Sequence, residues 1–350
     1  EAAKALTGDV TVEIYDKVTL NSSISGSFDS ITFVGKDTDA EIYLDVQGYI
    51  TATGKKVAFE DLILSKSAGG HIYNAGFMNV AFGVYDVVSV NYTNCTFANG
   101  AYASSGDVTF TKCTFYRSHD KYGLWAYGDT NAVVDSCVFN DYRGIKMYAE
   151  GAAKTTDLTV KNTNFSAVSD KPAIVLTYGE SVTLEGNTYS STGTFELDLD
   201  GAPNGVAVTS DVAPTCKNDN GACGVLVDGK IYTTVAQAAA VAESGSTVTL
   251  LHASTETVEL AEGVTLDKNG FEADGVTVAA PAPQAGYVYA YVGETTIWGE
   301  TWSNAKVSHV FKFYNGDVLM GTAELNPALY TFTGSQTPTW HINFNDLDGD

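Results

Sequence analysis

The sequence predicts an all-β protein built on a parallel β-helix, a rod of short strands coiled into stacked turns, followed by small β-rich modules. Its 350 residues contain 34 glycines and only 17% charged residues, which is typical of many short strands joined by tight turns. A short motif recurs through the middle of the chain behind alternating strands, and this repetition predicts stacking. The hydrophobic fraction of 44% is sufficient for a packed core.

The repeated motif has five copies that align without gaps. The copies are T-N-C-T-F, T-K-C-T-F, D-S-C-V-F, K-N-T-N-F and E-G-N-T-Y, and their third residues are separated by 18, 24, 26 and 24 positions. A spacing close to one coil predicts that equivalent residues stack about 4.8 Å apart. We therefore expect two inward columns, one of Cys95, Cys113, Cys137, Thr163 and Asn187 and one of Phe97, Phe115, Phe139, Phe165 and Tyr189.

The three stacked cysteines are interpreted as small buried residues. A metal site is the alternative, but the sequence has no Cys-x-x-Cys spacing and no nearby histidine, so a structural ladder is favoured. A second strand in each coil is marked by a tyrosine followed by a turn, at Tyr85, Tyr102, Tyr127, Tyr148 and Tyr178. With earlier, less regular coils included, the solenoid is expected from about residue 8 to residue 213.

The repeated motif is similar to that of a known family. Coils of the form V-x-[FVL]-x-x-C/N-x-F followed by a polar, glycine-containing turn resemble the pectate-lyase-like superfamily of right-handed parallel β-helices, especially adhesin-like surface proteins of bacteria and archaea. The resemblance covers about 200 residues and implies the fold. It leaves the activity open, because the superfamily includes lyases, glycosidases, tailspikes and non-catalytic adhesins.

Three domains are expected: the parallel β-helix over 1–213, a capping or repeat module over 214–280 that either stands alone or continues the solenoid, and a small antiparallel β-sandwich-like domain over 284–350. In the second, Thr234 and Gln237 form a capping box for a short helix within an alanine run ending at Gly245. The chain start repeats this module, since A-A-K-A-L-T-G-D-V-T-V aligns with A-A-V-A-E-S-G-S-T-V-T. We expect two copies of one capping unit, the first without its first strand and half of its helix.

The third domain is predicted from alternating strands and from an Asn315–Gly316 hairpin turn. The last five residues, D-L-D-G-D, are similar to part of a Ca²⁺ loop, but the ligand spacing is unfinished. No cofactor is expected, and Ca²⁺ is the one ion left open.

The charge and the cysteines limit which binding partners and which cellular compartment can be expected. A net charge of −23 excludes an electrostatic footprint for nucleic acid or an anionic membrane. Cys216 and Cys223 bracket a polar turn and are expected to form a disulfide, which indicates an oxidising, extracellular compartment.

The densest ionisable cluster follows the phenylalanine motif, where register places Arg117 over Asp141 and His119 beside Arg143. An enzyme would use Asp120 and Asp141 as a carboxylate pair for glycoside hydrolysis, or an arginine such as Arg143 as the base of an eliminating lyase. The alternative is a salt-bridge ladder along a turn, which is favoured because the motifs of polygalacturonases and a lyase Ca²⁺ cluster are missing.

An outward aromatic stripe is expected beside this cluster. If Leu124 and Ile145 point inward, then Trp125, Tyr127, Tyr148 and Tyr178 point outward, and stacked aromatic rings beside charges can hold sugars. The competing interpretation is a tyrosine stack that is buried or packs against another chain. The candidate ligand-binding residues are therefore Arg117, His119, Trp125, Tyr127, Arg143 and Tyr148.

Two functions remain open at this point. The first is a non-catalytic extracellular adhesin or structural protein of a surface layer or fibre, with a glycan, a surface protein of another cell or further copies of itself as partner. The alternative is a carbohydrate-active β-helix enzyme, a lyase or hydrolase, or a tailspike-like glycan binder.

Overall fold

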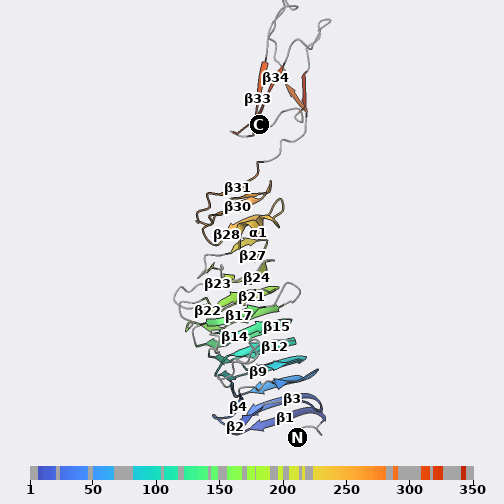
Figure 1. Cartoon of the computed structure of the whole chain (residues 1–350), viewed down its shortest axis with the longest axis vertical. Coiled ribbons are helices and arrows are strands. Elements are labelled where there is room, and N and C mark those ends of the chain that lie inside the picture. The colour runs from blue at the N-terminus through green and yellow to red at the C-terminus, as the bar shows by residue number, and fades with distance from the viewer. Residues whose placement is uncertain are drawn as a thin grey trace, which may run out of the picture. The chain divides into compact units, whose positions relative to one another are not determined.

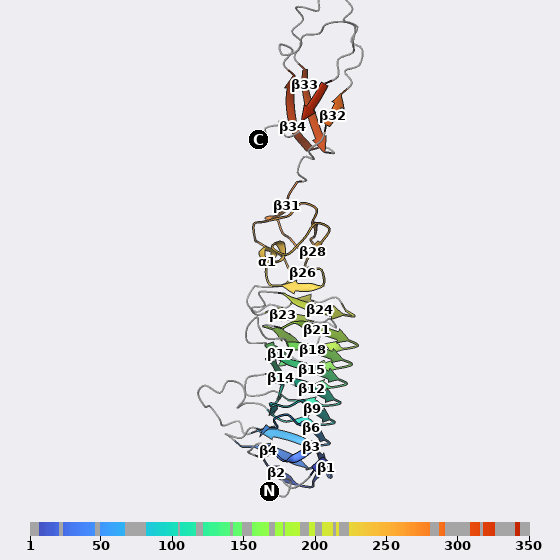
Figure 2. The same cartoon turned by 90° about the vertical axis from the view of Figure 1, so that its right-hand side faces the viewer.

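The computed structural model of the chain is nearly all β and divides into two compact units, Glu1–Val278 and Ala279–Asp350 (Figure 1). The structure describes residues 7–20, 24–45, 50–66, 82–103, 106–116, 122–140, 143–148, 156–167, 172–177, 179–189, 196–199, 205–212, 215–216, 224–280, 287–290, 309–315, 318–325 and 340–343. In the first unit, strands from successive coils lie one above another (Figure 2).

Three sheets form the faces of the first unit. The first face has 13 strands in the order β1 (Thr7–Ile14), β3 (Ser27–Gly35), β6 (Lys56–Glu60), β9 (Ser89–Thr93), β12 (Gly106–Thr111), β15 (Thr130–Asp135), β18 (Thr156–Lys161), β21 (Ser181–Glu185), β24 (Val206–Ser210), β27 (Lys230–Tyr232), β26 (Val225–Val227), β28 (Thr247–Leu250) and β30 (Thr265–Asp267). From β1 to β24 every neighbouring pair is parallel. The face is therefore the parallel stack that the repeat predicts.

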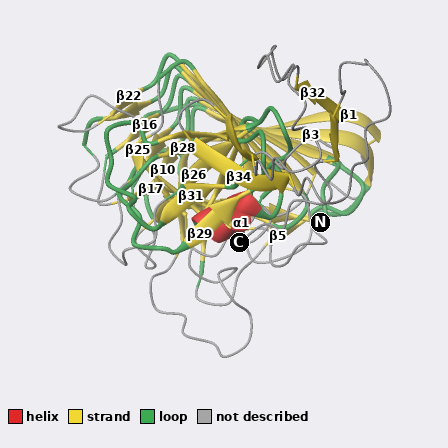
Figure 3. Ribbon diagram, turned by 90° about the horizontal axis from the view of Figure 1, so that it is seen from above, coloured by secondary structure: helices red, strands yellow, loops and turns green. Residues whose placement is uncertain are grey.

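The other two faces are narrower. The second has 8 strands: β2 (Lys17–Thr19), β4 (Glu41–Leu44), β7 (Ile63–Lys66), β10 (Thr96–Phe97), β13 (Thr114–Phe115), β16 (Val138–Phe139), β19 (Asn164–Phe165) and β22 (Thr188–Tyr189). The third has 6: β11 (Ala101–Ala103), β14 (Tyr122–Tyr127), β17 (Arg143–Tyr148), β20 (Ile174–Leu176), β23 (Glu196–Leu199) and β25 (Thr215–Cys216). A further parallel pair joins β5 (Ile50–Thr51) and β8 (Val84–Tyr85). Seen along the stack, the strands of each face overlie one another (Figure 3).

The predicted phenylalanine column is confirmed on the second face. Phe97 pairs in register with Phe115, and Phe115 pairs with Phe139. Successive rings from Phe97 to Tyr189 are stacked, with centroids 5.0, 4.5, 4.8 and 5.6 Å apart. The four phenylalanines have 0% exposure. Offset stacking at these distances adds to the burial of each ring.

A second aromatic column, which the sequence did not reveal, lies on the first face. Phe33, Phe59, Tyr92 and Phe110 stack with centroids 5.3, 5.2 and 4.9 Å apart. Tyr92 also meets Phe97 edge to face at 5.0 Å, so the two columns interlock inside the coil. The core is therefore filled by rings from two faces and not from one.

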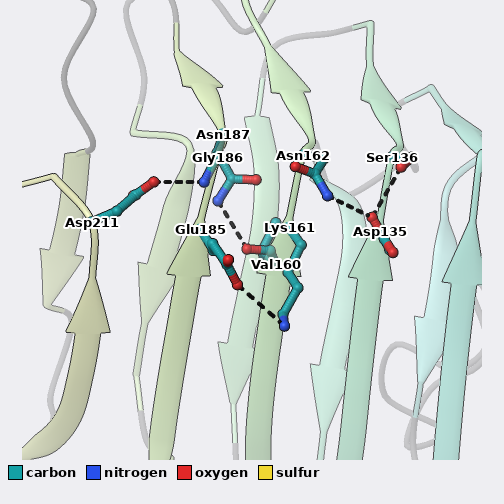
Figure 4. Close-up of polar contacts among 9 residues, drawn as sticks. All are labelled: Asp135, Ser136, Val160, Lys161, Asn162, Glu185, Gly186, Asn187 and Asp211. Atoms are coloured by element: carbon teal, nitrogen blue, oxygen red, sulfur yellow. Dashed lines mark hydrogen bonds and ion pairs between the residues drawn. The ribbon is translucent and has the colours of Figure 1, made fainter.

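The predicted ladder of Cys95, Cys113, Cys137, Thr163 and Asn187 is also confirmed inside the coil, where the three thiols are free and buried. The Cys113 amide donates to Cys137 Sγ at 3.3 Å, the Cys137 amide to Thr163 Oγ1 at 3.3 Å, and the Thr163 amide to Asn187 Oδ1 at 2.9 Å. Asn187 Nδ2 donates to the Val160 carbonyl at 2.9 Å (Figure 4). The ladder side chains thus satisfy buried backbone amides between coils.

The corner before each ladder residue is a left-handed turn. Asn94, Lys112, Ser136 and Asn162 have φ between 49° and 56°, and Gly186 has φ 65°. Asparagine and glycine enter this region most easily. The side chain of the corner residue Asn162 donates from Nδ2 to Asp135 Oδ1. Beside it, Lys161 forms an ion pair with Glu185 at 3.2 Å (Figure 4). The turn geometry explains why three of the five copies carry asparagine or glycine before the third position.

Residues 224–278 form a smaller cluster in which β26 and β27 make a hairpin and β29 (Val258–Leu260) pairs in parallel with β31 (Val276–Val278). The helix α1 (Val235–Ala239) begins with the predicted capping box, which is confirmed: Gln237 N donates to Thr234 Oγ1, and Thr234 N donates to Gln237 Oε1. The helix ends at Ala239, with Ala240 as its C-cap, and therefore stops well before Gly245.

The second unit contains two antiparallel pairs, β32 (Tyr287–Ala290) with β35 (Trp340–Asn343) and β33 (His309–Asn315) with β34 (Val318–Leu325). Gly316 of the predicted turn and the final D-L-D-G-D segment lie outside the described residues. The sandwich-like domain and the three domain boundaries stay predictions.

Candidate functional site

The outer surface of the third face carries the side chains that the sequence singled out. Leu124 and Ile145 point inward, as expected, and have 0% exposure in the core. Alternation along a strand then turns Trp125 and Lys146 outward. Register places Tyr102 beside Trp125 and Trp125 beside Lys146 on successive coils. The predicted alternation therefore holds on β14 and β17.

The outward aromatic side chains form a small core of their own. Tyr102, Tyr122, Trp125 and Val175 are buried together outside the main core, with Tyr127 packed against them. The Tyr122 and Trp125 rings meet edge to face at 4.9 Å, and the Tyr102 and Tyr127 rings are 5.7 Å apart. We call these five residues the outer aromatic cluster. Trp125 is only 4% exposed, so this ring forms the base of the surface rather than an open platform.

Arg143 is held against the outer aromatic cluster by a hydrogen bond and a ring contact. Its Nη1 donates to Tyr122 Oη at 2.6 Å, and its guanidinium carbon lies 5.2 Å from the centre of the Tyr122 ring. Both groups follow from register, because Tyr122 and Arg143 pair across β14 and β17. A planar guanidinium fixed over an aromatic ring presents its remaining donors in a defined direction.

The accessible part of this surface consists of half-buried side chains. Tyr127 and Tyr148 pair in register, and their rings stack 5.5 Å apart with an angle of 15°. Lys146 and Arg143 are half-buried on the same strand as Tyr148. The surface therefore combines two stacked tyrosines with two cations in a chain whose net charge is −23.

Several predicted site residues lie outside the described part of the chain. These are Arg117, His119, Asp120, Asp141, Tyr178 and Cys223. The carboxylate pair, the stacking of Arg117 over Asp141 and the disulfide therefore stay predictions, although Cys216 belongs to β25.

The comparison with known families decides the fold. Residues 51–220 match the model of a family described as a right-handed β-helix region. This segment is a right-handed β-helix. No curated protein and no solved structure matches the chain significantly. The fold of the β-helix is thereby established, whereas its activity has to be argued from its own residues.

Three further observations concern metal ligands, membrane-spanning helices and the buried thiols. Among the described residues, no three histidine, cysteine or acidic side chains come together as metal ligands, and no helix is long and apolar enough to cross a membrane. The pKa values of Cys95 and Cys137 are raised, because each thiol is hydrogen-bonded to the Cys113 thiol and is buried. Both side chains are buried in the main core, where they contribute to its packing.

Three members of the outer aromatic cluster were not predicted from the sequence. Tyr122 and Val175 are not among the predicted site residues, and Tyr102 is predicted only to mark a strand. Alternation on β14 gave no signal for Tyr122, because a period of two places this residue on the side of Leu124 and opposite Trp125. The contact between Tyr122 and Arg143 depends on the pairing of two coils, which a single strand does not reveal.

Proposed function

We propose that the chain is an extracellular, non-catalytic surface protein whose β-helix displays a glycan-binding face. The observation that carries the proposal is the outer aromatic cluster with its accessible rim of Tyr127, Tyr148, Arg143 and Lys146. Stacked aromatic faces give apolar contact to the C–H faces of sugar rings, and guanidinium and ammonium groups donate hydrogen bonds to hydroxyl and carboxylate oxygens.

The rigidity of the support favours recognition. Arg143 to Tyr148 lie on a strand that is paired in parallel on both sides, with β14 and with β20. The inward residues of the same strand, Ile145 and Met147, are 0% exposed. A side chain that projects from such a strand loses little freedom on binding, so a shallow surface can retain a ligand.

Charge favours an acidic glycan at this face. The two arginines of the chain, Arg117 and Arg143, are separated by one coil in the sequence, and Lys146 lies on the same strand as Arg143. In a chain of net charge −23, the half-buried cations Arg143 and Lys146 attract an acidic sugar to this face.

The experiment is binding of the full chain to an array of neutral and acidic glycans. We expect Lys146→Gln and Tyr148→Ala each to weaken binding by about tenfold, which corresponds to about 1.4 kcal/mol. The matched controls are Lys161→Gln on the first face and Tyr43→Ala on the second, which remove the same groups elsewhere and should bind like the wild type.

Binding that is lost equally in the controls, or that no glycan supports, contradicts the proposal. The alternative of a carbohydrate-active enzyme is tested on the same glycans by following chain cleavage. Cleavage that disappears with Asp141→Asn while binding remains would assign the chain to that class instead.

A further inference from the structure

The outer side of the first face carries a central column of short side chains that pair in register from β3 to β24. Their neighbours along each strand, such as Val57 and Phe59, are buried in the core, so alternation turns the column outward. The members are exposed or half-buried. The column consists of Thr32, Ala58, Asn91, Thr109, Val133, Thr159, Thr183 and Thr209. Because every member is short, a second flat surface can approach the sheet closely.

Charged side chains lie on both sides of the central column, and on two strands they are arranged symmetrically about it. On β6, Lys56 lies two residues before Ala58 and Glu60 two residues after it. On β18, Asp157 lies two residues before the column and Lys161 two residues after it. Each of these strands therefore presents one charge of either sign at equal distances from the column.

Lys56 and Glu60 have no opposite charge beside them on the neighbouring coils. Their partners in register are the uncharged residues Ser30, Ser89, Val34 and Thr93. Both charged side chains are exposed, and no ion pair in the described part of the chain includes either of them. Their charges are therefore available to a partner outside the coil.

A two-fold rotation about the central column brings these charges into opposite pairs. The rotation places the residue before the column against the residue after the column on the same strand of a second copy. Lys56 then faces Glu60 of the second copy and Glu60 faces its Lys56, and Asp157 and Lys161 face each other in the same way. An interface of this kind uses one patch on both chains and is the commonest form of self-association.

The other charged strands of the first face also fit this rotation. On three of them a neutral donor comes to lie opposite a carboxylate: Thr111 opposite Asp107, Asn131 opposite Asp135 and Ser181 opposite Glu185. On β1, Asp9 faces Glu13, and Lys36 lies 3.0 Å from Glu13 and compensates its charge. With the two rods antiparallel, Lys56 can face Asp157, but Asp107 then meets its own copy. Parallel rods are therefore favoured.

The first face is large enough for a small dimer interface. The eight strands from β3 to β24, spaced about 4.8 Å apart with about five residues of 3.3 Å each, cover about 600 Å² per copy. The total of about 1,200 Å² lies at the lower limit of specific, stable interfaces.

We propose that the first face is the interface of a homodimer, in which two copies of the chain lie face to face with parallel rods and the two-fold axis runs along the central column. The charges of β6 and β18 set the register, and the short side chains of the column allow the sheets to approach. The interface is independent of the proposed glycan face, because that face lies on the third sheet.

The test is self-association of the full chain, followed by sedimentation velocity over roughly 1 to 100 µM protein. At physiological ionic strength charges are screened over about 8 Å, so the net charge of −23 counts less than charges in contact. Lys56→Glu replaces attraction by repulsion twice in the dimer. Lys56→Glu combined with Glu60→Lys exchanges the two charges and keeps the pairing only if these residues face each other.

The matched control is Lys268→Glu, which changes the net charge by the same amount at an exposed residue outside β3–β24. We expect the dissociation constant to rise by about tenfold or more in Lys56→Glu and to return to within about threefold of the wild type in the exchanged variant. The control should dimerise like the wild type.

Three results overturn the proposal. The first is a wild type that stays monomeric up to about 100 µM. The second is an exchanged variant that associates as weakly as Lys56→Glu, because Lys56 then lies opposite another residue. The third is an equal loss in Lys268→Glu, since net charge alone then governs association.

Discussion

Replacement of Tyr92 by phenylalanine is expected to stabilise the β-helix. The Tyr92 ring is 1% exposed and stacks between Phe59 at 5.2 Å and Phe110 at 4.9 Å. Its hydroxyl is buried and has no hydrogen-bond partner in the part of the chain that the structure describes. The ring belongs in the column, whereas the oxygen is a buried polar atom without compensation.

The magnitude follows from these two facts. A buried hydroxyl without a partner costs about 1 to 3 kcal/mol. Its removal leaves a gap of about 10 Å³, which costs roughly 0.2 kcal/mol at about 24 cal/mol per Å³. Both ring stacks are kept, so we expect Tyr92→Phe to raise the free energy of unfolding by about 1 to 2 kcal/mol.

The assay is equilibrium unfolding in guanidinium chloride followed by circular dichroism, with the requirement that the denaturant slope stays that of the wild type. The control is Tyr189→Phe at the end of the other column, where the hydroxyl is near Asn187 and is only partly buried. That change should be neutral or destabilising. If Tyr92→Phe lowers stability, the reasoning about the hydroxyl is refuted.

The pH dependence provides a second readout of the same residue. Burial raises the pKa of Tyr92 well above its usual value of 10.0. Above the unfolded pKa the unfolded chain binds fewer protons than the folded one, so the wild type loses stability as the pH rises. The advantage of Tyr92→Phe should therefore increase above about pH 10. An advantage that is constant with pH would contradict the assignment.

Three further predictions concern the same core. Phe139→Ala removes a ring stacked on both sides and should cost about 3 to 5 kcal/mol in denaturant unfolding, whereas the exposed Tyr116→Ala should change stability by less than about 0.5 kcal/mol; similar values for the two would argue against the column. Thr163→Val deprives the Cys137 amide of its acceptor and should cost about 1 to 3 kcal/mol, and an unchanged midpoint would refute the ladder. Burial, opposed by Asp45, lowers the pKa of Lys66 from 10.5 to about 8. Between these values the unfolded chain binds more protons, so stability should rise with pH in the wild type but not in Lys66→Met; parallel pH profiles would contradict this.

The repeated motif was sufficient to predict the phenylalanine column. Its copies share one offset between the ladder residue and the ring, and a period of two places both residues on the same side of a strand. The column through Phe33, Phe59 and Tyr92 was not predictable in the same way. Its residues lie in early coils of irregular length, so no constant spacing aligns them. Only strand pairing, such as Phe59 with Tyr92, brings them together.

The candidate site shows the same limit. Alternation correctly turned Trp125 outward, but local pattern could not indicate that an outward side chain would be only 4% exposed. Exposure depends on segments distant in the sequence, and so does the contact between Arg143 and Tyr122. Lys66 is the reverse case. Its polar surroundings, S-K-S, gave no sign of burial, yet pairing with Leu44 turns it inward, where it is 2% exposed.

The amide ladder gives the rod a direction of assembly. Each amide, from Cys113 through Thr163, is satisfied by a side chain that comes later in the chain. During synthesis from the N-terminus, a newly formed coil thus has a buried donor that waits for its successor. A chain that stops early leaves the ladder amide of its last coil without the acceptor that the next coil brings. Each coil therefore supplies the acceptor for a buried amide of the coil before it.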